Sequence, residues 1–166
     1  HVLRLDVIGT ASGASVSGEN ILAGTSNYFL NGLTGPEQTN VEQFGSVVYD
    51  GVYDGIDLRY YGNQRQLEYD FIVAPETDYQ QIRFGFEGAE SLTISESGDL
   101  VIQLNAAGEV VTFKAPIAYQ TDAERNRQIV ESRYLLNSDG TVGFALGSYD
   151  TTRELVIDPI LDYTTF

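Results

Sequence analysis

Residues 49–71, YDGVYDGIDLRYYGNQRQLEYDF, carry the strongest structural signal in the chain. Apolar and charged side chains alternate over Ile56–Tyr61 and again over Leu67–Val73, with the period of two that is typical of β-strands. The polar segment Gly62–Gln66 between these two runs predicts a tight turn. We therefore expect a β-hairpin with one aromatic face and one charged face.

Two registers of this hairpin keep its apolar residues on a single face. With Asn63 and Gln64 in the turn, Asp57 faces Asp70, whereas a turn one residue further along places Arg59 opposite Asp70. The first register is favoured because asparagine tolerates a positive φ angle. Either register surrounds the arginine with carboxylates, which predicts a salt-bridge ladder on the solvent-exposed face.

The same acids are candidate metal ligands. Asp57 and Asp70, together with Asp50 or Asp54 from the preceding turns, could supply oxygen atoms to Ca²⁺, which takes six to eight such ligands. The nearby Arg59 argues against a cation, and the spacing is not that of an EF-hand loop. The salt-bridge ladder is therefore the favoured hypothesis and a calcium site is the alternative.

Charge is the main compositional feature. The 166 residues include 24 acidic and nine basic ones, which gives a net charge of −15. Such a charge repels nucleic acids and anionic membrane surfaces, so neither is an expected partner. The chain has no cysteine and no run of apolar residues long enough to span a bilayer. It begins at His1 and contains no methionine, so we expect a piece excised from a much larger protein, and the composition favours an extracellular bacterial one.

The remainder of the chain predicts a single all-β domain over residues 1–166. Alternating runs and turn signals recur every eight to twelve residues, which indicates an antiparallel β-sandwich or open barrel of about ten to twelve short strands. Gly9–Asn20 is rich in glycine and serine and predicts a flexible loop. Asp78 is a candidate cap for one helical turn, and Gln120–Gln128 predicts a long hairpin loop or a brief helix. The other expected elements are a turn at Gly32–Pro36, a short apolar segment at Asn27–Leu30, and strands near Val2–Ile8, Phe44–Tyr49, Ile82–Phe86, Ser91–Ile94, Leu100–Leu104, Val110–Phe113, Val130–Leu136, Thr141–Leu146 and Leu155–Ile157.

Several kinds of catalysis are excluded by residue type. The only histidine is His1 and there is no cysteine, so the chain offers no Ser-His-Asp triad, no Cys-His pair and no ordinary zinc site. A hydrolase using two carboxylates has the required residues, although no pair is distinguished by its spacing. The single lysine, Lys114, is expected on the exposed face of a strand, with an intramolecular isopeptide bond as the less favoured alternative.

Long segments of the chain resemble a known family. They are VYDGIDLRYYGNQRQLEYDFIVAP, IRFGFEGAESLTISESGDLVI, FKAPIAYQ and VGFALGSYDTTRELVIDPILDYTTF, and with the earlier TNVEQFGSVVY they extend the resemblance from about Asn27 to the end. The family is a β-rich domain of unknown function that precedes SBBP-type β-propeller repeats in large bacterial secreted and cell-surface proteins. One departure is Asp54, where the family usually has proline. The resemblance implies a location and a context, and it supplies no catalytic residues.

We therefore predict a non-catalytic structural or interaction module of an adhesin-like secreted or surface protein, without a cofactor unless calcium is bound. Its expected partners are neighbouring modules of the same polypeptide, or a surface glycan or protein. One alternative is a carbohydrate-binding module that uses exposed tyrosines as stacking platforms, with Tyr61 as the candidate. The least favoured alternative is the two-carboxylate hydrolase.

Overall fold

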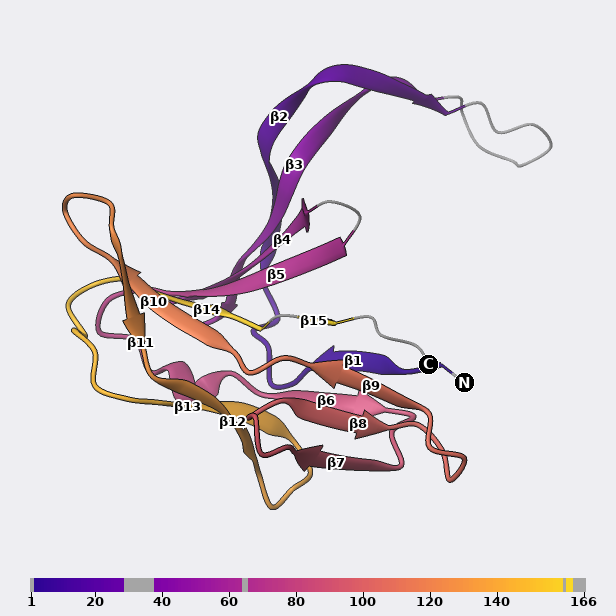
Figure 1. Ribbon diagram of the computed structural model, residues 1–166. Coiled ribbons are helices and arrows are strands. Elements are labelled where there is room, and N and C mark those ends of the chain that lie inside the picture. The colour runs from indigo at the N-terminus through magenta and orange to yellow at the C-terminus, as the bar shows by residue number, and fades with distance from the viewer. Residues whose placement is uncertain (1, 29–37, 64–65, 160, 163–166) are drawn as a thin grey trace.

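The computed structural model describes residues 2–28, 38–63, 66–159 and 161–162, which form fifteen strands and one 3-10 turn (Figure 1). The elements are β1 Arg4–Val7, β2 Ser15–Tyr28, β3 Gln38–Tyr53, β4 Ile56–Asn63, β5 Gln66–Val73, η1 Tyr79–Gln81, β6 Phe84–Glu87, β7 Ser91–Ile94, β8 Leu100–Gln103, β9 Val110–Phe113, β10 Ile117–Thr121, β11 Arg127–Val130, β12 Ser132–Leu136, β13 Val142–Leu146, β14 Leu155–Asp158 and β15 Leu161–Asp162. The predicted turn at Gly32–Pro36 and part of the predicted segment Asn27–Leu30 lie outside the described residues.

The strands form three antiparallel sheets. A seven-stranded sheet has the order β11-β10-β14-β5-β4-β3-β2, and two four-stranded sheets have the orders β1-β6-β13-β12 and β15-β9-β8-β7. This arrangement confirms the prediction of an all-β sandwich. The strand number exceeds the expected ten to twelve, partly because the run predicted at Val130–Leu136 is divided between β11 and β12.

Aromatic rings join the three sheets into one core. Phe71 of the large sheet packs against Phe144 of β13 with ring centroids 6.0 Å apart, and Phe144 packs against Phe84 at 5.6 Å. Phe86 of β6 meets Phe113 of β9 at 5.4 Å, so the two smaller sheets also face each other. Burial of these rings supplies much of the apolar area that stabilises a domain of this size.

The hairpin of β4 and β5 lies near the middle of the large sheet, between β3 and β14. Its register pairs Arg59 with Asp70 and Tyr60 with Tyr69. The alternative register is therefore the correct one, and the favoured register with Asp57 opposite Asp70 is wrong. The observed pairing brings the rings of Tyr60 and Tyr69 to 5.7 Å on the face that turns toward the core.

The predicted loop at Gly9–Asn20 is wrong over its second half, because β2 begins at Ser15. This segment is a strand because its backbone pairs with β3. Its few apolar residues give no alternating pattern from which the strand could be predicted. Gly18 is required there because an added Cβ atom would lie 2.4 Å from the ring of Phe44. Figure 1 shows β2 and β3 rising together from the body of the domain.

The far part of this hairpin is a two-stranded ribbon, which we call the arm and define as residues 20–28 and 38–45. The pairing of β3 with β4 begins only at Ser46, and β2 is the last strand of the sheet. Within the residues that the structure describes, the arm therefore has β-pairing within itself but no third strand beside it. Two-stranded ribbons are marginally stable in water without further packing.

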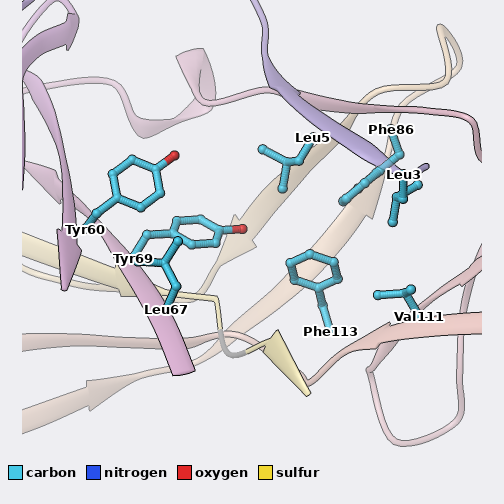
Figure 2. Close-up of a pocket in the computed structure, with 8 residues that line it drawn as sticks. All are labelled: Leu3, Leu5, Tyr60, Leu67, Tyr69, Phe86, Val111 and Phe113. Atoms are coloured by element: carbon cyan, nitrogen blue, oxygen red, sulfur yellow. The ribbon is translucent and has the colours of Figure 1, made fainter. Parts of the chain in front are cut away.

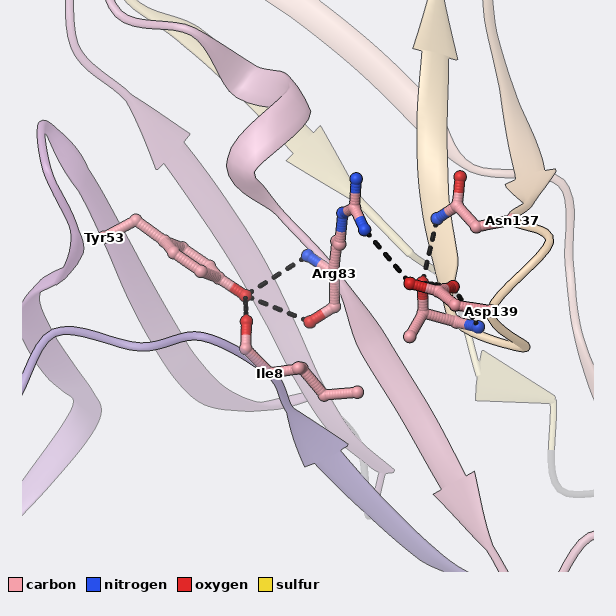
Figure 3. A network of polar contacts seen from close by, with 6 residues as sticks. Ile8, Tyr53, Arg83, Asn137 and Asp139 are labelled. Atoms are coloured by element: carbon pink, nitrogen blue, oxygen red, sulfur yellow. Dashed lines mark hydrogen bonds and ion pairs between the residues drawn. The ribbon is translucent and has the colours of Figure 1, made fainter.

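A buried tyrosine hydroxyl fastens the large sheet to the smaller sheet that contains β1 and β6. The hydroxyl of Tyr53 lies 2.7 Å from the carbonyl oxygen of Ile8 and 3.0 Å from that of Arg83, and it accepts a hydrogen bond from the Arg83 amide at 3.2 Å (Figure 3). The Arg83 guanidinium reaches Asp139 at 3.1 Å, which extends the network to the turn between β12 and β13. This network links β3 of the large sheet to the residues just after β1 and just before β6 in the smaller sheet.

Two local predictions are confirmed. Asp78 caps the single 3-10 turn, because its side chain accepts a hydrogen bond from the Gln80 amide at 2.9 Å. The segment predicted as a long hairpin loop or brief helix joins β10 to β11 as a hairpin. In the described part of the chain, no helix has the length and hydrophobicity needed to cross a bilayer.

Candidate functional site

The outer face of the β4–β5 hairpin holds a polar cluster that is less exposed than the sequence predicts. Asp70 is only 7% exposed, and its Oδ1 accepts a hydrogen bond from the Tyr61 hydroxyl at 3.1 Å. Arg59, which faces Asp70 in the register, directs its Nε toward Glu19 of β2 at 3.3 Å. The predicted solvent-exposed ladder is therefore partly a buried network that joins β4, β5 and β2.

A second carboxyl lies beside Asp70. Asp158 follows Ile157 in β14, and Ile157 pairs with Phe71, so the two acids occupy adjacent positions on the outer face. Burial, together with the negative charges of Asp70 and Glu68, raises the pKa of Asp158 to about 6, and the positive charge of Arg127 partly offsets this effect. Burial also raises the pKa of Asp70, although the hydrogen bond from Tyr61 partly offsets this effect. Carboxyls with raised pKa values in a polar cluster mark a candidate site on physical grounds.

The cluster continues onto the β10–β11 hairpin. The guanidinium carbon of Arg127 lies 4.2 Å from the ring centroid of Tyr119, a cation–π contact. Tyr119 pairs with Val156 of β14, which places it on the same face as Asp158. The outer face thus carries two tyrosines, two carboxyls of raised pKa and two arginines, and we call this group the outer cluster: Arg59, Tyr61, Asp70, Tyr119, Arg127 and Asp158.

The other predicted metal ligands accept hydrogen bonds from nearby residues or are exposed to solvent. Asp57 accepts a hydrogen bond from the Gly51 amide at 2.7 Å, which closes the turn before β4. Asp50 accepts hydrogen bonds from the hydroxyls of Ser15 and Ser17, each at 3.2 Å. Asp54 is exposed, and its carbonyl oxygen accepts a hydrogen bond from a side chain of η1.

Within the described residues, no three histidine, cysteine or acidic side chains lie close enough together to hold a metal ion. Of the four acids predicted to bind calcium, only Asp57 and Asp70 share the outer face of the hairpin. The calcium site stays a prediction, which melting with Ca²⁺ and then with EDTA would test.

Lys114 forms an ion pair on the surface. Its ammonium nitrogen lies 3.3 Å from Oδ2 of Asp99, and the lysine side chain is 47% exposed. This geometry is that of two charged groups in contact with solvent, which agrees with the favoured expectation for this lysine. The isopeptide bond stays a prediction, and an intact-mass measurement would test it.

The inner face of the large sheet is not fully covered by the other two sheets. Near the ends of β4 and β5 it opens into an apolar hollow of about 310 Å³, lined by Leu3, Leu5, Tyr60, Leu67, Tyr69, Phe86, Val111 and Phe113. Figure 2 shows the two tyrosine rings entering from one side, with Leu5 and Phe113 opposite them. A hollow of this size and composition is at the lower limit of known ligand pockets.

A second hollow adjoins the first at Tyr60. It encloses about 560 Å³ and extends to Ala14 and Tyr49 at the base of the arm. Tyr49 stacks edge to face on Tyr60 at 5.8 Å, so a row of tyrosines connects the two hollows. We call the two hollows together the groove. Among its described lining residues the only charged side chains are Arg4 and Asp6, which form an ion pair at 2.9 Å.

The arm exposes large apolar side chains. Ile21 is 67% exposed and Leu22 is 47% exposed, and the rings of Tyr28 and Phe44 are also exposed. At the root of the arm and beside the groove, Val16, Val47, Tyr49 and Leu67 are exposed as well. Scattered apolar residues are normal on protein surfaces, but a continuous group of this kind marks a contact surface.

Sequence reasoning missed most of these features. Asp158 stands at the end of an otherwise apolar strand, and the period of two would have placed it on the polar face beside Val156. The arm gives no such signal because glycine, serine and asparagine interrupt its alternation. Tyr61 is half-buried and hydrogen-bonded to Asp70, so the predicted stacking platform is part of the outer cluster and is not an isolated ring.

Comparison with known proteins assigns the chain to a family. A family model described as Domain of unknown function (DUF7948) matches residues 1–160, so the chain belongs to this family. No curated protein and no solved structure shows a significant match to the chain.

Proposed function

We propose that this domain is a non-catalytic interaction module of a large bacterial secreted or cell-surface protein. The observation that carries the proposal is the uncovered apolar surface formed by the arm and the groove. The arm, and the rim of the groove at Tyr49 and Leu67, expose apolar side chains that a domain acting alone would bury. Both regions carry few charges in a molecule with a net charge of −15. Their partners are neighbouring modules of the same polypeptide or another protein at the cell surface.

The charge distribution supports a protein partner. A strongly acidic domain repels nucleic acids and anionic membranes over its whole surface. A ribbon whose only charged residue in the described arm is Glu42, and whose outer edge is unpaired in the described sheet, instead suits contact with another polypeptide, which can add hydrogen bonds and apolar contacts together. The setting in a large bacterial surface protein comes from the resemblance to domains that precede propeller repeats.

Hydrogen exchange tests this proposal. The backbone amides of residues 20–28 would be compared between the isolated domain, diluted until it is monomeric, and the longer polypeptide that carries it with its flanking segments. We expect at least about tenfold slower exchange in the longer polypeptide, because a partner that covers the arm removes its local opening. Amides of β11, around the exposed Ile129, provide the control. Equal exchange of the arm in both samples would overturn the proposal.

A second candidate function uses the outer cluster. An aromatic ring beside carboxylates and guanidinium groups is a combination that binds sugars, because the ring stacks on apolar C–H groups and the charged groups bind hydroxyls. Tyr61 supplies the ring, and Asp70 and Arg127 supply charged groups on the same face. Tyr119 is only 9% exposed and its ring is covered by Arg127, so it supports the arginine and does not stack on a ligand. Glycan-array binding that disappears in Tyr61→Ala and persists in Tyr49→Ala would support this function. An array without any bound glycan would remove it.

A further inference from the structure

The arm and the groove are complementary to each other. The arm is a protruding, apolar ribbon and the groove is a concave, apolar surface, and a single copy carries both. The arm rises away from the body in Figure 1. We propose that two copies of the domain exchange arms, each placing its arm in the groove of the other, to form a symmetric dimer. This inference rests on the proposed interaction function and names its partner as a second copy of the chain.

The low charge of the arm and the groove permits a second copy of this acidic chain as the partner. Two copies that each carry −15 repel each other over most of their surfaces. Only two of the 24 acidic residues, Glu37 and Glu42, and none of the nine basic residues fall between Asn20 and Gly45. The groove contains a single neutralised pair, Arg4 and Asp6. The arm and the groove are therefore the surfaces through which two such acidic molecules can approach most closely.

The groove provides apolar surface that can cover exposed side chains of the arm. Ile21 and Leu22 are adjacent in the chain and are both largely exposed, and adjacent strand residues point to opposite faces of the ribbon. Each face of the arm consequently carries an exposed apolar side chain. The groove has apolar walls from the large sheet on one side, at Tyr60 and Leu67, and from β1 on the other, at Leu5. An arm laid along the groove contacts these apolar residues with one face.

The expected contact area is sufficient for a dimer. The eight residues from Ile21 to Tyr28 extend about 27 Å at about 3.4 Å per residue, and a two-stranded ribbon is about 10 Å wide. One covered face therefore buries about 270 Å² on the arm and a similar area on the groove. Two reciprocal contacts bury about 1,100 Å² in total, which is at the lower end of specific interfaces.

Reciprocity gives the assembly a defined size. An arm placed in the groove of a neighbour without exchange would leave one free arm and one free groove, and such contacts continue into open chains. When two copies exchange arms about a two-fold axis, no arm and no groove is left over. We therefore expect a dimer of twice 18.2 kDa and no larger species.

Sedimentation velocity measures the assembly directly, over protein concentrations from about 1 µM to about 1 mM. The wild-type domain is expected to pass from monomer to dimer in this range, with stronger association at higher salt because salt screens the repulsion between two acidic copies. The double variant I21D/L22D charges both faces of the arm, and Leu67→Asp charges the groove. Each is expected to weaken the dimer at least about tenfold.

Ile129→Asp is the matched control, because Ile129 is 71% exposed on β11 and lies outside both the arm and the groove. This control should dimerise as the wild type does. All four substituted positions are exposed, so folding of each variant can be confirmed from its circular dichroism and melting curve.

Mixing the two variants separates arm exchange from other dimers. Each substitution is expected to remove the contact in which it lies, so each variant homodimer loses both contacts. An equimolar mixture of I21D/L22D and Leu67→Asp keeps one contact between an intact arm and an intact groove, so it should form a heterodimer more tightly than either variant alone. If two β2 edges paired with each other instead, Leu67→Asp would dimerise normally. Normal dimerisation of that variant, no gain on mixing, or open-ended oligomers would each overturn arm exchange.

A monomer at every concentration would also overturn the dimer, but it would leave the proposed interaction function standing if the arm amides are protected in the longer polypeptide. Unprotected arm amides in the longer polypeptide would remove the interaction function itself.

Discussion

Two hairpins of the same sheet differ in how many strands flank them and in how deeply their side chains are buried. The β4–β5 hairpin has a strand on each side, the other two sheets beneath its inner face and a hydrogen-bonded polar cluster on its outer face. The β2–β3 hairpin is also antiparallel, but its pairing has register shifts after Ile21 and after Ser26, and it ends in an arm that has no third strand among the described residues. Phe71 in the first hairpin is 1% exposed, and Phe44 in the second is 39% exposed.

The difference shows that strand pairing alone does not stabilise a region. Backbone hydrogen bonds replace bonds to water and contribute little net free energy, whereas apolar burial contributes in proportion to the area removed from water. The β4–β5 hairpin is therefore part of the folding core. The arm depends on a partner for the burial that the domain itself does not provide.

The largest expected effect comes from shortening the same residue type in the two hairpins. Phe71→Ala should lower the free energy of unfolding by about 3–4 kcal/mol, because it leaves a cavity against Phe144. Phe44→Ala in the arm should lower it by less than about 1 kcal/mol. Urea denaturation of both variants measures the two values. Losses of equal size would mean that the arm belongs to the folding core.

Two glycines provide a second comparison. Gly55 has a φ of +72°, and an added Cβ atom would lie 2.4 Å from Oγ1 of Thr77. Gly55→Ala should therefore destabilise the fold by about 2 kcal/mol. Gly24 in the arm has a φ of +109°, which also strains an alanine, but no described atom lies within 4 Å of an added Cβ atom. Because the arm is not part of the folding core, this local strain should change the global free energy of unfolding by less than about 1 kcal/mol.

Melting curves decide between these values. Gly62→Ala is the control for the methyl group itself, since nothing lies within 4 Å of an added Cβ atom at that position. If Gly24→Ala destabilised the domain as much as Gly55→Ala, the arm would be as firmly held as the body.

The connection between the sheets gives a smaller effect. Tyr53→Phe removes the hydroxyl that forms hydrogen bonds with the Ile8 carbonyl oxygen and the Arg83 amide. The free energy of unfolding should therefore fall by about 1–2 kcal/mol. Tyr49→Phe, in the same strand near the root of the arm, should change it by less than about 0.5 kcal/mol. Chemical denaturation of both variants would test this, and a neutral Tyr53→Phe would show that packing alone holds the sheets together.

The smallest effect concerns pH. Because the pKa of Asp158 is raised to about 6, the folded state binds this proton more tightly than the unfolded state does. This group therefore adds stability as the pH falls through 6, and the gain is complete below the unfolded value of about 4. Solvent screens the exposed part of the carboxyl, so the change is about 1 kcal/mol between pH 7 and pH 5.

Asp158→Asn removes this titration. The variant should be more stable than the wild type at pH 7, and its melting temperature should rise less between pH 7 and pH 5. The exposed Asp54→Asn serves as the control for a simple reduction of net charge. If both variants retained the wild-type pH dependence, the outer cluster would not be the buried site described above.

Most strands follow from the sequence because alternation is a local property. The run at Ser91–Ile94 and the run at Val110–Phe113 have the predicted bounds, and the turn ending at Gly140 joins β12 to β13 as expected. The Asp78 cap was equally predictable, since a side chain that accepts a hydrogen bond from the backbone two residues later needs no distant partner.

The register of β4 and β5 was not predictable from the turn residues. Asn63 favoured one register, but packing on the inner face selected the other, with Tyr60 against Tyr69 and Phe71 against Phe144. Ring contacts of this kind are worth about 0.5–1.5 kcal/mol each beyond the area they bury, which exceeds a turn preference. The same packing moved Asp70 from an expected surface ladder into a buried hydrogen bond with Tyr61.

The sequence by itself determined the β class, the approximate strand positions, the acidic field and the absence of thiol and triad chemistry. These depend on side-chain period and residue type, which are properties of the chain alone. Only the tertiary structure decided which strands became neighbours, and with that the register, the partial burial of the outer cluster, the groove and the projecting arm. Burial depends on what packs against a residue, and in the described part of one copy Ile21 stays 67% exposed and Leu22 47% exposed, although Ile21 pairs with Phe44.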